Sequence, residues 1–367
     1  MNNNYGAGFE DNPSSEAPQQ AVDAAIASSL RLQQQGYKLS QDLSKKLLAA
    51  RTAYLRRLTT LMTPAKYAKW KETKLKHRND LRAALAKVEP SYEGEMAIKN
   101  TRKEIIAKAE RFTGEIAFNT EMAKPLRDQH SKNLAALFKG ALDIPDKHVF
   151  LTSTGPKNNP HPWTAIVPPY SGSAWEYYWE ITDEPSVPSF ARYLDRAAGQ
   201  LGSYTFTRVY GADDSDYSFI WYRTGVRFWY KMPAAGILEL YLKLQAIYDN
   251  YWGDFDNEWG WSDAHCLQLS RPYVRVISPT LGNIRYGNTI LNYNRYGTSD
   301  YWNRNVVGPG NYGWAYSLSD ASYPANQWLY IEAGMYDYNY FWSNDVTIES
   351  KMNMKWFVPS IYVRPKT

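Results

Sequence analysis

The chain has 367 residues, 44% of them hydrophobic, which is enough apolar surface to fold and excludes a chain that is disordered as a whole. A single cysteine, Cys266, excludes a framework of intramolecular disulfides. The net charge of +5 is unevenly spread, because residues 1–145 carry 24 Lys and Arg against 16 Asp and Glu, while the remaining residues carry 18 against 21.

Residues 1–20 are rich in Asn, Ser, Pro and Gln, which is typical of a flexible tail. They lack the basic start and the apolar run of a secretory signal peptide. No stretch of the chain approaches the roughly 20 apolar residues that a membrane-spanning helix needs. We therefore expect a protein that stays in the cytoplasm or is exported by a non-classical route.

Residues 21–142 form a basic region in which apolar residues have helical spacing, so we expect an α-helical unit. Leu43 and Leu58 widen the apolar stripe of its first helix. Residues seven apart define that stripe: Leu47, Tyr54 and Leu61, followed one position later by Leu48, Leu55 and Met62.

Further helices in this region are predicted from residues that start or end helices. Thr63-Pro64 indicates a helix start, because threonine caps helix N-termini and proline suits the first turn. A third apolar run covers 98–116, and a fourth short helix is expected after Pro125. Short breaks between helices favour an antiparallel bundle, while a coiled-coil hairpin that closes against another subunit is the alternative. Residues 143–145 are the expected linker.

Residues 147–367 change to an apolar period of two, which predicts antiparallel strands with one buried face. The clearest strands are Gly236–Ile247 and Val346–Val358. We expect a β-sandwich, jelly-roll-like, with long loops and one short helix over 188–200. Weaker strands are predicted at His148–Thr152, Ala174–Ile181, Tyr204–Tyr210, Tyr217–Lys231, Tyr273–Ser278, Ile290–Arg295 and Trp328–Ala333.

An acidic loop follows the first clear strand and is the candidate metal site. Its carboxylates come from Asp254, Asp256, Glu258 and Asp263, and oxygens at alternate positions suit Ca²⁺. The spacing departs from that of an EF-hand, and a solvated turn explains the same residues. A pair of these carboxylates would alternatively act as acid and base on a glycosidic bond, which cleavage of a polysaccharide panel would reveal.

Aromatic residues are concentrated in the β half, which holds 13 of the 14 Trp and 25 of the 30 Tyr. Exposed rings stack on sugars and anchor protein partners, whereas buried rings fill a sandwich core, to which we assign Trp221, Trp229 and Trp356. The candidate ligand-binding residues are Tyr293, Tyr296, Tyr301, Trp302, Tyr312, Trp314, Trp259 and Trp261.

The basic segment 38–87 carries 14 Lys and Arg against three Asp and Glu. A solvated helix face is the plainest explanation, while an anionic membrane surface and, less favoured, nucleic acid are the possible partners. Leakage of liposomes that requires this region would support a helical pore-forming or membrane-acting toxin with a β receptor-binding domain.

Catalytic motifs fail on inspection, so no catalytic residue is assigned. Gly308, Gly310 and Gly313 match a dinucleotide-binding pattern by letter, but no helix pattern follows them. His265 and Cys266 are neighbours, and neighbours in a strand point to opposite faces. The sequence favours a non-enzymatic binding or structural protein that recognises glycan or protein through an aromatic loop face. Its helices would serve oligomerisation or anchoring, in a homo-oligomer or a larger assembly.

Overall fold

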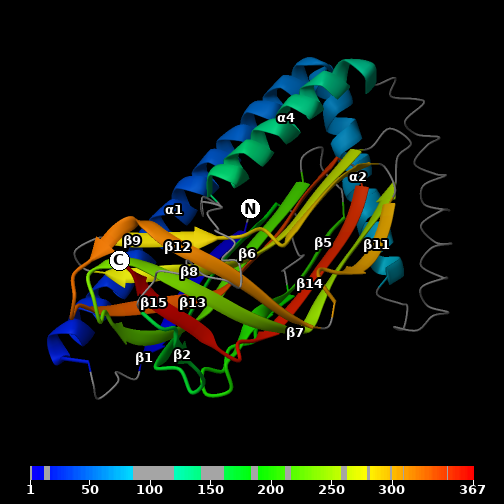
Figure 1. Cartoon of the computed structure of the whole chain (residues 1–367). Helices are drawn as coiled ribbons and strands as arrows, with labels where there is room; N and C mark the ends of the chain where they lie inside the picture. The colour runs from blue at the N-terminus through cyan, green and yellow to red at the C-terminus, as the bar shows by residue number, and fades with distance from the viewer. Residues whose placement is uncertain are drawn as a thin grey trace.

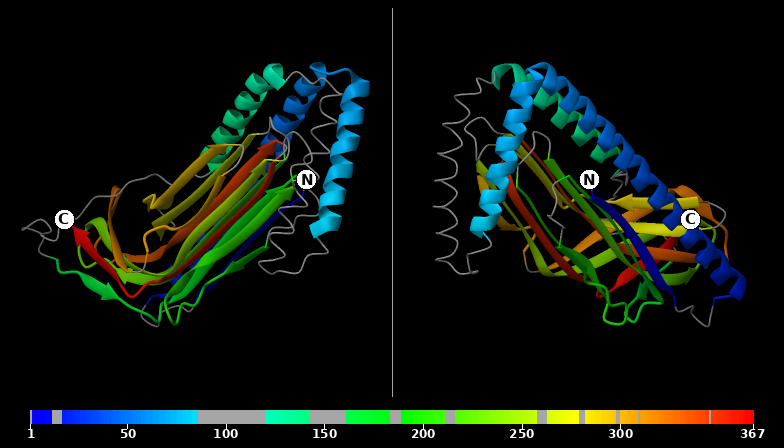
Figure 2. Two further views of the ribbon diagram at one scale, coloured as in Figure 1. Left: turned by 90° about the vertical axis from the view of Figure 1, so that its right-hand side faces the viewer. Right: turned by 180° about the vertical axis from the view of Figure 1, so that it is seen from behind.

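The computed structural model of the chain describes residues 2–11, 17–85, 120–141, 161–182, 189–210, 216–257, 263–278, 282–297, 300–308, 310–344 and 346–367. They form two antiparallel β-sheets stacked on each other, with helices along one side of the pair (Figures 1 and 2). A β-sandwich-like fold with N-terminal helices therefore agrees with the sequence, and the jelly-roll part of the expectation stays a prediction.

One sheet, called sheet A, has the strand order β1-β3-β6-β13-β8-β10, and β9 pairs with β8. The strands are β1 (Asn2–Asp11), β3 (Gly172–Ile181), β6 (Asp216–Lys231), β8 (Asp263–Ser278), β9 (Gly282–Gly287), β10 (Leu291–Gly297) and β13 (Trp328–Asn344).

The second sheet, called sheet B, has the order β2-β15-β7-β14-β5-β4, and both β11 and β12 pair with β7. The strands are β2 (Thr164–Ile166), β4 (Ser189–Arg192), β5 (Gln200–Tyr210), β7 (Gly236–Asn257), β11 (Asp300–Asn305), β12 (Asn311–Tyr323), β14 (Val346–Phe357) and β15 (Ile361–Lys366).

Period-two alternation predicted the sandwich core well. Leu240 and Leu242 of β7 and Met352 and Met354 of β14 are fully buried between the sheets, as expected. Trp356 is also a core residue, as assigned. Glu239 is an exception, because its carboxylate was expected on the wet face and is instead buried against the guanidinium of Arg364, 2.7 Å away.

One expected segment has a different structure. Residues 189–192 form strand β4 and Asp195 pairs with Gln200 in an isolated bridge, so the short helix predicted over 188–200 is wrong. This stretch closes a turn instead of a helix, since the Asp195 carboxylate accepts from the backbone N–H groups of Ala197 and Ala198. The strand predicted at 148–152 lies outside the described residues.

The flexible tail expected over 1–20 is wrong for its first part. Asn2–Asp11 forms β1, which pairs antiparallel with β3 along its whole length. Gly6 and Gly8 make this possible, because a Cβ atom at either position would lie within 2.7 Å of the Tyr177 or Trp175 ring. Glycines opposite large aromatic rings thus let a polar segment pair with a sheet edge. Composition alone does not reveal this pairing.

The helices are α1 (Gln19–Thr60), α2 (Pro64–Leu85) and α4 (Thr120–Ala141). The predicted start at Pro64 is confirmed, and the hydroxyl of Thr63 accepts from the Lys66 N–H at 3.3 Å. The fourth helix begins before the residue we expected, since Pro125 lies inside α4. The predicted run at 98–116 and the linker at 143–145 lie outside the described residues.

The expected helical bundle is not confirmed, because α1 and α4 lie side by side on the outer face of sheet A (Figure 1). Leu43 and Leu47 of α1 and Leu134 and Phe138 of α4 share one apolar cluster with sheet A aromatics. The Phe138 ring centroid lies 4.2 Å from that of Tyr340. Of the predicted stripe, Leu48 is half exposed and faces away from this cluster.

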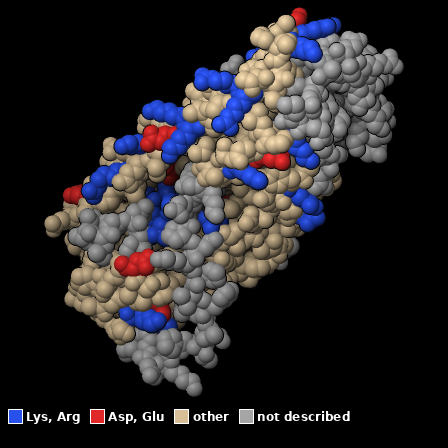
Figure 3. Space-filling view, turned by 90° about the horizontal axis from the view of Figure 1, so that it is seen from above, with Lys and Arg blue, Asp and Glu red and all other residues tan. Residues whose placement is uncertain are grey.

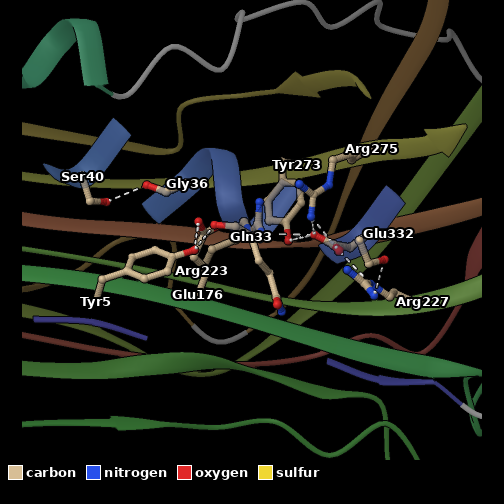
Figure 4. A network of polar contacts seen from close by, with 11 residues as sticks. Tyr5, Gln33, Gly36, Ser40, Glu176, Arg223, Arg227, Tyr273, Arg275 and Glu332 are labelled. Carbon is tan, nitrogen blue, oxygen red and sulfur yellow. Dashed lines mark hydrogen bonds and ion pairs between the residues drawn. The ribbon is translucent and has the colours of Figure 1, made fainter. Parts of the chain in front are cut away.

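A buried ionic network lies under the N-terminal half of α1, on the outer face of sheet A (Figure 4). Its centre is the Glu332 carboxylate of β13, which accepts from Arg227 Nε at 2.8 Å and from Arg275 Nη2 at 2.7 Å. The Tyr273 hydroxyl donates to the same carboxylate at 2.6 Å. Burial alone would raise the pKa of Glu332, but the arginines hold it well below its usual range.

The network continues to the edge of the sheet through Glu176 of β3. Its carboxylate accepts from Arg223 Nη2 at 2.7 Å and from the Tyr5 hydroxyl at 2.8 Å (Figure 4). Gly36 of α1 lies directly above, because a Cβ atom there would be 1.9 Å from Glu176 Oε1. A glycine in the middle of a 42-residue helix thus lets α1 approach the charged face of the sheet.

Candidate functional site

The structure separates the predicted aromatic residues into core and surface. Trp302 is 2% exposed and its Nε1–H donates to Gln268 Oε1 at 2.9 Å between the sheets, so its interpretation as a ligand-facing residue is wrong. Large inward rings fill the space between two stacked sheets, and Trp302 meets this need. Trp221 and Trp229, which we assigned to the core, lie on the outer face of sheet A, in the clusters packed under the helices.

The other predicted aromatics are divided in the same way. Tyr293, Tyr312 and Trp314 are half-buried and pack against the sandwich core. Tyr296 and Tyr301 are 57% and 61% exposed, but they lie in different sheets, on β10 and β11. Among the described residues, the predicted aromatics therefore do not form a single loop face. Trp259 and Trp261 lie outside the described residues.

The predicted acidic loop joins β7 of sheet B to β8 of sheet A. Asp254 and Asp256 lie in β7, whereas Asp263 begins β8, and Glu258 lies outside the described residues. Among the described residues, no group of three or more His, Cys, Asp or Glu side chains converges on a common point. The Ca²⁺ site and the carboxylate pair for glycoside cleavage stay predictions, because the side chains of Asp256, Glu258 and Asp263 are not described.

The basic segment 38–87 falls on α1 and α2. Lys and Arg side chains predominate over acidic ones along the ridge that α1 and α4 form on top of the molecule (Figure 3). Within the described chain, no helix combines the length and the apolar character needed to cross a bilayer. The anionic membrane and nucleic-acid partners of this segment stay predictions.

A different surface gathers exposed aromatic and amide groups, and it is the outer face of sheet B. While α1 contacts β1, β3 and β8 of sheet A, the part of this face that lies over β5, β11, β14 and residues 248–252 of β7 has half-buried and exposed side chains. We call it the platform, and it consists of Tyr193, Tyr204, Phe206, Tyr248, Asn250, Trp252, Tyr301, Asn303, Lys351, Asn353 and Lys355.

The strand register arranges the platform in rows. Trp252 of β7 lies opposite Lys351 of β14, and Lys351 lies opposite Phe206 of β5. The next row is polar at its centre, because Asn250 lies opposite Asn353, with Tyr204 beyond it. Side chains directly opposite in adjacent strands are close enough to act together. The platform is therefore a continuous surface built from strands distant in the sequence.

Contacts within the platform hold its polar groups near its rings. The Tyr193 hydroxyl donates to Asn353 Oδ1 at 2.9 Å, and Asn250 Nδ2 donates to Asn303 Oδ1 at 2.7 Å. Lys355 Nζ lies 5.3 Å from the Tyr193 ring centroid. These contacts place amide and ammonium groups beside the faces of the rings.

Tyr193 supplies a hydroxyl group at one side of the platform. Burial, followed by the nearby hydroxyls of Tyr204 and Tyr248, raises the pKa of Tyr193 above its ordinary value. Tyr193 therefore stays neutral and offers both a donor and an acceptor oxygen. The Tyr193 hydroxyl therefore joins the asparagine amides in offering hydrogen bonds to a polar ligand.

The sequence predicted which face some platform residues occupy, but not that they belong to one surface. The alternation of Val346–Val358 correctly placed Lys351, Asn353 and Lys355 on the wet side of their strand. Tyr193 and Tyr204 were missed, because only the pairing of β4 with β5 and of β5 with β14 brings them beside Asn353. The one usable signal was the period of two, which gives a face but not the neighbouring strand.

No known protein family matches the chain, and no curated protein matches it. Among solved structures, a chain described as "CBM4 structure and function" aligns with 47% of this chain and with 86% of its own length. The aligned residues are 9% identical and the TM-score is 0.12. A TM-score this low carries no argument about fold or function.

Proposed function

We propose that this protein is a non-enzymatic binding or structural protein whose platform recognises a glycan. The observation that carries the proposal is the combination of Tyr204, Tyr248 and Trp252 with asparagine amides on one open sheet face. Aromatic faces stack on the C–H patches of sugar rings, and amide groups pair with sugar hydroxyls in both directions.

The shape of the site favours an extended ligand over a small one. The platform runs across paired strands from β4 to β11, through β5, β14 and β7. Successive strands in a sheet lie about 4.8 Å apart, so the platform spans roughly 20 Å. That length matches several consecutive sugar units, which would each contact one or two rings.

The proposal assigns the helices to oligomerisation or anchoring rather than to ligand contact. The ridge of α1 and α4 lies on sheet A, and the platform lies on the opposite side of the sandwich (Figure 2). A ligand on sheet B and an assembly contact on the helical side would not compete for the same surface.

A glycan array followed by calorimetry on the intact chain tests the proposal. The fragment 147–367 is unsuitable, because it lacks the edge strand β1 that pairs with β3. For a bound glycan, Tyr204→Ala and Tyr248→Ala are each expected to weaken binding roughly tenfold, which corresponds to about 1.4 kcal/mol.

Tyr37→Ala is the matched control, because Tyr37 is 49% exposed on α1 while Tyr248 is 53% exposed on the platform. Tyr296→Ala separates the platform from the aromatic stretch predicted from the sequence. Loss of binding with Tyr296→Ala but not with the platform variants would contradict the proposal, as would a complete failure of the wild-type chain to bind any glycan.

A further inference from the structure

A cavity of about 490 Å³ lies between α1, α4 and the outer face of sheet A. This volume is within the usual range for sites that hold small molecules. The cavity lies on the helical side of the sandwich, away from the platform. Its wall comes from residues 32–46 of α1, from Ala136 and Leu137 of α4, and from arginine and aromatic side chains of sheet A.

One part of the wall is strongly cationic. Arg223, Arg275 and Arg285 line the cavity together with Lys46, while Asp42 and Glu176 are its carboxylates. The Glu176 carboxylate is already bound by Arg223 and by the Tyr5 hydroxyl. Glu332 also binds Arg275, but the four cationic side chains of the wall still outnumber these three carboxylates, in a part of the protein where water screens charge poorly.

Among the described residues, the wall contains a buried donor that lacks a hydrogen-bond acceptor. Arg275 is 1% exposed, and its Nη2 donates to the Glu332 carboxylate (Figure 4). Within the described part of the chain, its Nε–H is buried and makes no hydrogen bond. Leaving such a group unpaired costs on the order of 1–3 kcal/mol, more when the group is charged. A ligand atom that accepts from the guanidinium would remove this cost.

The guanidinium groups of Arg275 and Arg285 repel each other and their neighbour Arg223 across the wall. Burial, then repulsion by Arg275 and Arg223, lowers the pKa of Arg285 to about 10. Burial and repulsion by Arg223 also lower the pKa of Arg275. A negative charge placed among these guanidinium groups would reverse both shifts.

The rest of the wall is apolar and aromatic. The Trp221 and Tyr336 rings are stacked with centroids 5.5 Å apart, and Leu43 and Leu137 come from the two helices. A ligand that fills the cavity therefore has an anionic end and an apolar body. Guanidinium groups bind carboxylates and phosphates through paired N–H donors, so either headgroup suits the cationic wall.

We propose that the cavity between α1, α4 and sheet A is a binding site for a small amphipathic anion. Arg275 and Arg285 hold its carboxylate or phosphate, and Trp221, Tyr336 and Leu43 enclose its apolar body. Lys46 of α1 lies at the exposed rim of the cavity and attracts the headgroup. This site is independent of the platform, and its ligand need not be a glycan.

Calorimetry on the full chain with decanoate, decyl phosphate, decanol and decyltrimethylammonium tests the site. We expect both anions to bind and the neutral and cationic analogues to bind at least tenfold more weakly. Inorganic phosphate alone, as a further probe, measures how much of the affinity the headgroup supplies. Binding of the anions should weaken as salt rises, because part of the attraction is electrostatic.

Lys46→Gln and Lys45→Gln form a matched pair, because both residues are exposed on α1 but only Lys46 lines this cavity. Lys46→Gln should weaken decanoate binding severalfold and Lys45→Gln should leave it unchanged. Arg285→Gln should weaken it roughly 10- to 100-fold, as expected for a charged hydrogen bond. Ala136→Phe should block the apolar part without changing charge.

Three results would overturn the proposal. Equal affinity for decanol and decanoate would show that the cavity binds apolar chains without selecting an anionic headgroup. Equal effects of Lys45→Gln and Lys46→Gln would show a general attraction of anions to a basic helix. Failure of every probe to bind the wild-type chain would show that the cavity holds only water. If Arg285→Gln does not fold, as judged by circular dichroism, the lysine pair still decides the question.

Discussion

The outer faces of the two sheets have similar residue types and opposite environments. The outer face of sheet A carries tyrosines, arginines and glutamates that lie buried under α1 and α4, such as Glu332 and Tyr338. The outer face of sheet B carries tyrosines, lysines and asparagines that meet solvent, such as Tyr248 and Asn353. The comparison teaches that a polar strand face is not necessarily a wet one, because a helix can cover it.

The difference is clearest in the carboxylates. Glu332 is completely buried and bound by Arg227 and Arg275, whereas Glu349 of β14 is half-buried on the open face. The free energy of a charge withdrawn from water depends strongly on its ion-pair partners, while that of a charge near water depends on them much less. Replacing each glutamate by glutamine therefore compares the two faces directly.

Glu332→Gln is expected to have the largest effect on stability. The substitution removes the charge that neutralises buried arginines, and breaking a buried ion pair costs about 3–5 kcal/mol. Glu349→Gln should change the free energy of unfolding by no more than about 0.5 kcal/mol. Urea unfolding at neutral pH, followed by circular dichroism, measures both. Similar small losses for the two variants would show that α1 does not exclude water from sheet A.

Strand β13 offers a second contrast, between the two faces of sheet A itself. Glu332 points toward the helices and Asp337 points into the sandwich, where its carboxyl accepts from Ser203 at 2.7 Å and Ser270 at 2.6 Å. Burial raises the pKa of Asp337 to about 7, because hydroxyl groups offset the loss of water less well than guanidinium groups do. Below neutral pH the same strand thus holds an ionised Glu332 and a largely protonated Asp337.

We expect Asp337 to make the protein less stable as pH rises. Between the unfolded pKa of about 3.8 and the folded pKa of about 7, the folded state keeps a proton that the unfolded state has lost. The free energy of unfolding therefore falls by roughly 1.4 kcal/mol per pH unit in this window. Asp337→Asn should remove this dependence and stabilise the protein at pH 8 relative to wild type. Parallel stability curves of the two proteins from pH 5 to pH 8 would contradict the assignment.

The sequence predicted individual helices and strands better than it predicted which of them pack or pair together. Thr63-Pro64 located a helix start and the alternation of Val346–Val358 located a strand, because capping and period are local properties. Strand β1 escaped detection, since its partner β3 lies more than 160 residues away and its glycines match rings in that partner. Composition favoured a flexible tail because it carries no information about distant pairing.

The candidate sites were beyond the reach of the sequence for the same reason. Trp302 and Tyr301 are adjacent in the chain, yet one is buried and the other is exposed. The ionic network joins Glu176, Arg223 and Glu332, which have no shared motif and meet only when β3, β6 and β13 align. Nothing local in these strands indicates that α1 covers their charged side chains.

The close approach of α1 to sheet A at Gly36 gives the smallest predicted effect on stability, and the sign of that effect is the test. Alanine in place of a helical glycine usually stabilises a helix by about 1 kcal/mol. At Gly36, however, the added Cβ would lie 1.9 Å from Glu176 Oε1 and 2.9 Å from the Tyr5 hydroxyl. Moving the carboxylate would disturb its 2.7 Å contact with Arg223, and overpacking costs typically about 1–3 kcal/mol.

We therefore expect Gly36→Ala to destabilise the protein by about 1 kcal/mol net, in urea unfolding at neutral pH. Gly297→Ala is the control, because a Cβ atom there would meet nothing within 4 Å. The opposite sign at Gly36, a stabilisation near 1 kcal/mol, would mean that only helix propensity acts there. In that case α1 would stand further from sheet A, and the buried face would be as wet as the platform on sheet B.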